Sequence, residues 1–167
     1  MDLQTRIVRV ITSRWAFVVY STVILLTGVS VFLSELGRFE SFFNEETALE
    51  DLATGFGTIL IGYGVLAEER ETLMKVFRLY PRFETPAEVQ IDHVCHVSGL
   101  GLLLLGLAAE IPVQLVKIPN DTVNTEGLEP FLFALSVLFN ALALIFLVRF
   151  IVSLVRLRPH PADEPAH

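Results

Sequence analysis

Residues 91–112 read IDHVCHVSGLGLLLLGLAAEIP, a polar beginning followed by a long apolar run. A run of this kind approaches the roughly 20 residues that an α-helix needs to cross about 30 Å of hydrocarbon. Three similar blocks occur elsewhere, and the 167-residue chain is 53% hydrophobic with a mean hydropathy of +0.60. Soluble domains contain only roughly 45–50% apolar residues. The sequence therefore predicts a helical membrane protein.

The apolar blocks predict an all-α integral membrane protein, a bundle of four transmembrane helices with short interfacial helices. The expected spans cover about residues 15–33, 48–67, 94–116 and 131–154. The second apolar block begins only at Leu52, but Asn44 is a good helix N-cap and the acids after it favour a first turn. Residues 1–158 are thus expected to form a single membrane domain. The proline-rich residues 159–167 are expected to be a disordered cytoplasmic tail.

The basic residues predict the orientation, because the cytoplasmic segments of membrane proteins collect Lys and Arg. They gather before the first span, between the second and third, and at the end of the fourth: Arg6, Arg9, Arg14, Arg70, Lys75, Arg78, Arg82, Arg149, Arg156 and Arg158. The two other connections hold only Arg38 and Lys117 against many acids. Both termini are therefore expected in the cytoplasm, with the chain in a bacterial inner or plasma membrane. The formal net charge of −7 comes largely from the outer connections and argues against a nucleic-acid partner.

Two connecting segments predict helices at the membrane surface. Residues 34–51 mix aromatic residues with acids, which is typical of an interfacial helix or, alternatively, of long helices that extend into the headgroups. Residues 71–83 are expected to lie on the inner leaflet, with Pro81 ending that helix. The capping box TPAE at residues 85–88 then predicts a new helix that begins at Pro86 and runs into the third span.

The polar beginning of the third span contains a candidate metal or pH-sensing cluster. In a helix from Pro86, Glu88, Asp92 and His96 share one face, because residues four apart are neighbours. The full candidate set is Glu68, Glu69, Glu88, Asp92, His93 and His96. The alternative is an ordinary polar helix end with an Asp92–His96 pair. Haem is disfavoured because two histidines from one helix cannot ligate opposite faces of the iron, and the single Cys95 excludes an intramolecular disulfide.

Glu110 is the strongest polar anomaly within a span. It lies roughly 9 Å inside the outer end of the third span, and Pro112 follows it. Carboxylates at such depth are costly and mark ion or proton paths. Together with Gln114 and Asn140, Glu110 is the candidate pathway; Asn140 is expected to hydrogen-bond across a helix interface. The alternative is a span that ends near Ala109 and leaves Glu110 at the interface.

Small residues at four-residue spacing predict close helix packing. The predicted contact residues are Ala53, Gly57, Thr58, Gly62, Gly99 and Gly106.

No nucleophile occurs with a base and an orienting group, so a non-enzyme is favoured. The expected function is a small oligomeric inner-membrane protein that forms or supports an ion or proton pathway, or an accessory subunit of a membrane complex. The alternative is a membrane-bound metal-binding or redox protein, possibly an enzyme, with a carboxylate–histidine site at the cytoplasmic ends of spans two and three. The expected partners are the bilayer and either further copies of the chain or a larger complex. Distance discriminates the two hypotheses, because oxygen and nitrogen ligands must lie about 2.0–2.2 Å from one zinc-like ion.

Overall fold

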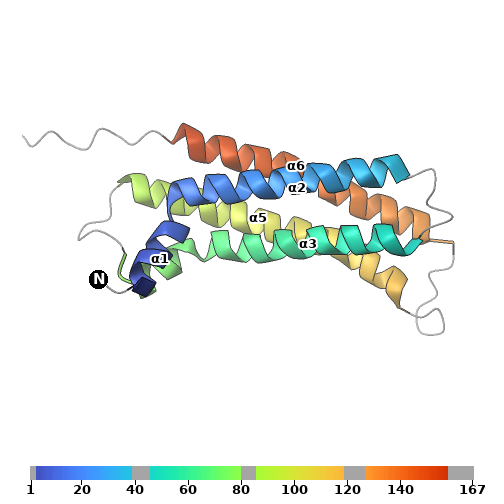
Figure 1. The fold of residues 1–167 in the computed structure, drawn as a ribbon, viewed down its shortest axis with the longest axis horizontal. Helices are drawn as coiled ribbons and strands as arrows, with labels where there is room; N and C mark the ends of the chain where they lie inside the picture. Colours follow the sequence, from blue (N-terminus) through green and yellow to red (C-terminus); the bar gives the residue numbers. More distant parts are fainter. Residues whose placement is uncertain (1–2, 39–45, 80–85, 119–126, 158–167) are drawn as a thin grey trace, which may run out of the picture.

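The computed structural model describes residues 3–38, 46–79, 86–118 and 127–157 (Figure 1). Within these ranges every regular element is an α-helix, so the predicted all-α class is confirmed. The helices are α1 (Leu3–Ile11), α2 (Arg14–Arg38), α3 (Glu46–Glu68), α4 (Arg70–Val76), α5 (Pro86–Lys117) and α6 (Glu129–Arg156).

Three helices of the described chain, α2, α5 and α6, are long and apolar enough to cross a membrane. Their surfaces carry many exposed apolar side chains, among them Leu26 at 64%, Phe131 at 65% and Ile145 at 60% exposure. Extended apolar surface of this kind is typical of contact with lipid. The fourth expected span corresponds to α3. Its described apolar part, Gly55–Glu68, is shorter than a membrane span.

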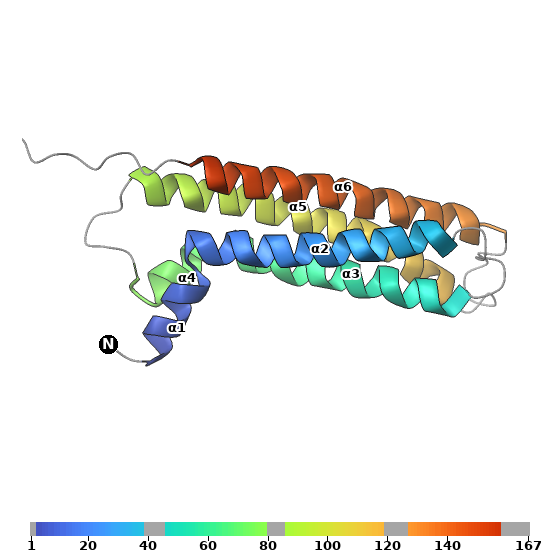
Figure 2. The same ribbon diagram turned by 45° about the horizontal axis from the view of Figure 1, so that its top comes forward.

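The long helices α2, α3, α5 and α6 lie side by side (Figure 1). The α3–α5 contact is the most extensive, followed by α5–α6 and α2–α6. The short helices α1 and α4 lie together at one end, beside the start of α2, the start of α5 and the end of α6 (Figure 2). We call this end the α4 end of the bundle.

The core is made of apolar side chains from all four long helices. Phe17, Leu60, Leu102 and Leu147 are each 0% exposed. Because lipid tails are as apolar as leucine, such a core is held in a membrane mainly by van der Waals packing rather than by the hydrophobic effect. Close approach of the helix backbones therefore matters most.

Glycines allow that approach between α3 and α5. A Cβ on Gly99 would lie 2.4 Å from the backbone nitrogen of Glu68 and 2.6 Å from the carbonyl oxygen of Gly64. A Cβ on Gly106 would lie 3.0 Å from the carbonyl oxygen of Gly57. Three of the glycines predicted to pack closely, Gly57, Gly99 and Gly106, thus lie where the two helices touch, and Gly64 is a contact that the sequence reasoning missed.

The other predicted packing residues differ. Gly62 takes no part in the α3–α5 contact, because it is exposed and a Cβ there would meet nothing within 4 Å among the described residues. Thr58 is also exposed, and its hydroxyl lies 3.4 Å from the carboxylate of Glu110 on α5. The side chain of Ala53 lies outside the described residues. The α3 face that meets α5 thus includes Gly57 and Gly64.

The short helix α4 ends before the proline predicted to end it. Pro81 lies outside the described residues, whereas α4 stops at Val76. Arg78 adopts φ +50°, and the backbone N–H groups of Arg78 and Leu79 bind the carbonyls of Lys75 and Met74 at 3.1 and 2.9 Å. This pair of bonds is a Schellman motif, in which a left-handed residue satisfies the last carbonyls of a helix. The motif, rather than a proline, ends α4.

The helix starts agree better with the sequence. The α5 helix begins at Pro86, as the capping box predicted, although Thr85 itself lies outside the described residues. It then continues through Pro112 to Lys117, so the helix does not end at Ala109. In the region 34–51, α2 continues to Arg38 and α3 begins at Glu46. Residues 39–45 lie outside the described part.

Candidate functional site

A buried arginine organises the α4 end of the bundle. Arg70, the first residue of α4, is only 2% exposed. Its Nε donates a hydrogen bond to the carbonyl oxygen of Thr12 at 2.8 Å, and its Nη2 binds Oε2 of Glu88 at 3.0 Å. Its Nη1 donates to Oδ1 of Asp92. One guanidinium thus joins the end of α1, the start of α4 and the first turns of α5.

The charges in this cluster compensate one another. Burial by itself lowers the pKa of the Arg70 guanidinium, but the hydrogen bond to Glu88 and the negative charge of Asp92 outweigh that effect and hold the pKa above its ordinary value. Asp92 is 7% exposed, and the Glu88 side chain 30%. A buried charge is tolerated when it is paired and hydrogen-bonded. The arrangement therefore fits a structural ion-pair cluster.

The metal hypothesis required these same carboxylates. The α3 and α5 helices are neighbours, as the hypothesis needed. However, Glu88 and Asp92 bind Arg70, whereas Nδ1 of His96 lies separately, 3.4 Å from Oε1 of Glu68. The other two candidates, Glu69 and His93, are exposed. Among the described residues, no three His, Cys, Asp or Glu side chains gather in a way that could hold a metal ion.

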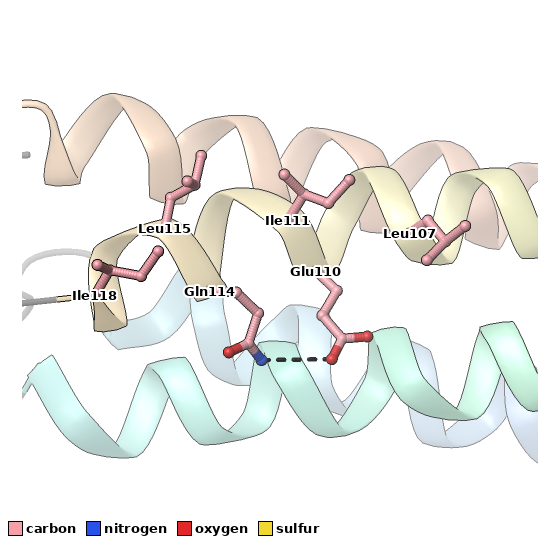
Figure 3. Close-up of a pocket in the computed structure, with 6 residues that line it drawn as sticks. All are labelled: Leu107, Glu110, Ile111, Gln114, Leu115 and Ile118. Atoms are coloured by element: carbon pink, nitrogen blue, oxygen red, sulfur yellow. Dashed lines mark hydrogen bonds between the residues drawn. The ribbon is translucent and has the colours of Figure 1, made fainter. Parts of the chain in front are cut away.

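A second polar site surrounds Glu110 on α5. The two carboxylate oxygens lie 3.4 and 3.5 Å from the Thr58 hydroxyl of α3, and the amide nitrogen of Gln114 lies 3.4 Å from Oε1 (Figure 3). Gly57 makes room for this side chain, since a Cβ there would lie 3.3 Å from the Cβ of Glu110. Gly57 comes 11 residues after Glu46, the start of α3, so Glu110 lies level with a point about 16 Å along that helix.

The Glu110 carboxylate differs from that of Asp92 in its surroundings. Within the described chain its partners are a hydroxyl and an amide, both neutral, and each contact is long. It is half-buried at the edge of an apolar groove of about 360 Å³ whose lining residues all belong to α5 or the residue that follows it: Leu107, Glu110, Ile111, Gln114, Leu115 and Ile118 (Figure 3). An acid placed this way can exchange a proton or accept a cation without first breaking a strong ion pair.

Asn140 on α6 is buried as expected but makes no hydrogen bond to any described group. It is 1% exposed, and neither Oδ1 nor Nδ2 has a partner in this part of the chain. The predicted bond across a helix interface comes instead from Ser136, whose hydroxyl donates to the carbonyl of Ala109 at 2.7 Å. Asn140 follows Ser136 by four residues, about 6 Å along the helix. It therefore lies about one turn nearer the α4 end than Ala109 and the neighbouring Glu110.

A third polar pair was not predicted. The Tyr63 hydroxyl donates to the carbonyl of Phe17 at 3.0 Å and lies 2.6 Å from the hydroxyl of Ser21. Ser21 is 0% and Tyr63 6% exposed. Nothing in the sequence marks these residues, because single hydroxyls are common in membrane helices. In the sequence, Arg70 likewise indicates only the topology, since a basic residue between two spans is ordinary.

Fold and sites together define a helical protein with three helices able to cross a membrane, an Arg70 ion-pair cluster, and a separate polar site around the single carboxylate of Glu110. Comparison with known protein families, with curated proteins and with solved structures finds no match for the chain. Its function is therefore inferred from the geometry alone.

Proposed function

We propose that the chain is a four-span membrane protein, with both termini cytoplasmic, that forms or supports a proton or ion pathway through Glu110. It acts as an oligomer or as an accessory subunit of a larger membrane complex. The observation that carries the proposal is a half-buried carboxylate in a candidate span that has only neutral partners among the described residues. The paired carboxylate of Asp92 provides the contrast within the same helix.

The packing of α3 supports a fourth span. This helix has 23 residues, which corresponds to about 34 Å at 1.5 Å per residue. It lies along α5, whose Glu88–Lys117 segment qualifies as a span. A helix packed along a transmembrane neighbour shares its depth in the bilayer.

The distribution of charge supports the orientation. Arg9, Arg14, Lys75 and Arg156 all belong to segments at the α4 end of the bundle. Lys117 marks the end of α5 at the opposite end. By the preference of Lys and Arg for the cytoplasmic side, the α4 end faces the cytoplasm.

Further polar groups inside the bundle support a pathway. From Glu110 toward the α4 end come Asn140, then the pair of Tyr63 and Ser21, then Arg70. A buried amide such as that of Asn140, which has no partner among the described residues, is a natural place for water or an ion. Fully buried Leu60, Leu102 and Leu147 also belong to this core. The arrangement fits a closed state that has to open before protons or ions can pass.

Reconstitution into liposomes tests the proposal. The full chain is placed in vesicles that contain a pH-sensitive dye, and a membrane potential is imposed with potassium and valinomycin. We expect proton uptake by the wild type and its loss in Glu110→Gln, which keeps the shape of the side chain but removes the acid. Glu71→Gln is the matched control, because Glu71 is exposed on α4 and pairs only locally with Lys75 among the described contacts.

The outcomes separate clearly. Flux that disappears only in Glu110→Gln supports the proposal. Flux in Glu110→Gln equal to that of the wild type and of Glu71→Gln would show that any pathway bypasses Glu110. If the wild type gives no flux with protons, sodium or potassium, the chain does not form a pathway by itself, and co-purification from native membranes then decides whether it supports one in a complex.

A further inference from the structure

A second groove lies between α5 and α6, away from Glu110. It has a volume of about 480 Å³ and is lined by three residues of α5 and four of α6: Gly101, Leu104, Leu105, Leu142, Ile145, Phe146 and Arg149. This volume lies within the roughly 300–1,000 Å³ of small-molecule sites. Leu104 is 57% and Ile145 60% exposed, so the groove opens to the outside of the bundle.

The floor of the groove depends on a glycine. A Cβ on Gly101 would lie 2.5 Å from Cζ of Phe146, so only glycine lets this ring lie directly against the α5 backbone. The ring, Leu105 and Leu142 give the groove apolar walls. An apolar chain can therefore lie along it.

One end of the groove carries a cation. Arg149 is exposed, and among the described residues it has no acidic or other polar partner. It comes seven residues before Arg156, the last residue of α6, and therefore lies about 10 Å inside that end of the helix. Leu142 lies a similar distance further in. The groove thus joins a single positive charge near the membrane surface to apolar walls at greater depth.

We propose that this groove binds a phospholipid with an anionic headgroup, such as phosphatidylglycerol, with the headgroup phosphate on Arg149 and one acyl chain along the apolar walls. A guanidinium forms strong, often bidentate hydrogen bonds with phosphate. An arginine near the end of a membrane helix extends its side chain to the headgroup level, where a lipid phosphate can pair with its charge. The extra negative charge of an anionic lipid makes it the preferred occupant at the cytoplasmic leaflet.

Native mass spectrometry of the full chain in detergent tests the proposal. The protein is titrated with phosphatidylglycerol and, separately, with phosphatidylcholine of the same acyl chains. We expect one phosphatidylglycerol per chain to be retained in preference to phosphatidylcholine, and Arg149→Gln to weaken its binding roughly tenfold. Arg149→Lys keeps the charge and retains most of the preference. Arg156→Gln is the matched control, since it removes an exposed charge from the same helix outside the groove.

Filling the groove provides an independent test that leaves the charge intact. Ile145→Trp places a larger side chain on an exposed, groove-lining position and is expected to reduce retention of the lipid while thermal unfolding in detergent stays unchanged. Equal binding of the two lipids would overturn the proposal. So would equal losses in Arg149→Gln and Arg156→Gln, or competition by millimolar inorganic phosphate that displaces the lipid completely, because the site would then recognise charge without the acyl chain.

Discussion

Replacing Arg70 by methionine tests whether the buried ion-pair cluster holds the α4 end of the bundle together. Methionine is unbranched and flexible and fills much of the same space without the charge. The substitution removes the donor to the Thr12 carbonyl. It also removes the positive charge that pairs with Asp92 and Glu88. Asp92, at 7% exposure, then loses its guanidinium partner.

The expected costs differ among the partners. Breaking a buried ion pair from one side costs about 3–5 kcal/mol, which we expect for Arg70→Met. Glu88→Gln is expected to cost about 1 kcal/mol or less, because the Glu88 side chain is 30% exposed and water can replace part of the interaction. Asp92→Asn lies between the two, since Arg70 keeps Glu88 as a partner. The double variant Arg70→Met/Asp92→Leu is expected to recover most of the loss, because an apolar pair can replace a buried ion pair.

Unfolding by SDS titration in mild detergent micelles, followed by circular dichroism, measures these differences. The double-mutant cycle isolates the coupling between Arg70 and Asp92. A cost for Arg70→Met below about 1 kcal/mol would refute the reasoning, since it would mean that the guanidinium is not buried against Asp92. A larger effect for Glu88→Gln than for Arg70→Met would refute the assigned order of burial.

Three further predictions use the same unfolding assay. Gly99→Ala should destabilise the bundle by about 1–3 kcal/mol, because the new Cβ would lie 2.4 Å from the α3 backbone. Gly62→Ala should be neutral or stabilise by up to about 1 kcal/mol, because its Cβ would meet nothing within 4 Å. Equal effects of the two variants would contradict the assigned α3–α5 contact. Arg78→Gly should stabilise the protein by up to about 1 kcal/mol, because Arg78 adopts φ +50° at the end of α4 and glycine adopts this angle without strain. A loss of stability would show that the Arg78 side chain contributes more than its backbone strain costs. Asn140→Leu should stabilise the protein by about 1–3 kcal/mol, since it removes a buried amide that has no partner among the described residues. The same substitution should slow liposome flux. A loss of stability would instead indicate a lost hydrogen bond.

Much of the helical framework follows from local sequence signals. The apolar blocks correspond to the long helices, and TPAE places the start of α5 at Pro86 because Thr, Pro and Glu in that order satisfy the first backbone N–H groups of a helix. Glu110 was also found from sequence, since a charge in an apolar run is conspicuous. These signals lie within a few neighbouring residues and need no knowledge of packing.

The tertiary partners could not be found in this way. In α3 the outward and inward faces are both apolar, so the repeat of small residues did not distinguish Gly62 from Gly64, and only the packed helices show that Gly64 meets Gly99. Arg70 and Asp92 are 22 residues apart on different helices, and their pairing depends on how α4 turns back toward α5. The same turn brings Arg70 onto Glu88 and Asp92, whereas His96 lies against Glu68, so the expected metal ligands have different partners.

The position of Arg70 in the chain has a consequence for biosynthesis. Of its partners, Thr12 emerges from the ribosome before it, whereas Glu88 and Asp92 emerge later. In the proposed topology the guanidinium is therefore first an unpaired cation that helps to retain its loop on the cytoplasmic side. Once the start of α5 has been synthesised, Arg70 can pair with Glu88 and Asp92, and its buried guanidinium then connects α1 and α4 with α5. One side chain would thus direct insertion first and complete folding afterwards.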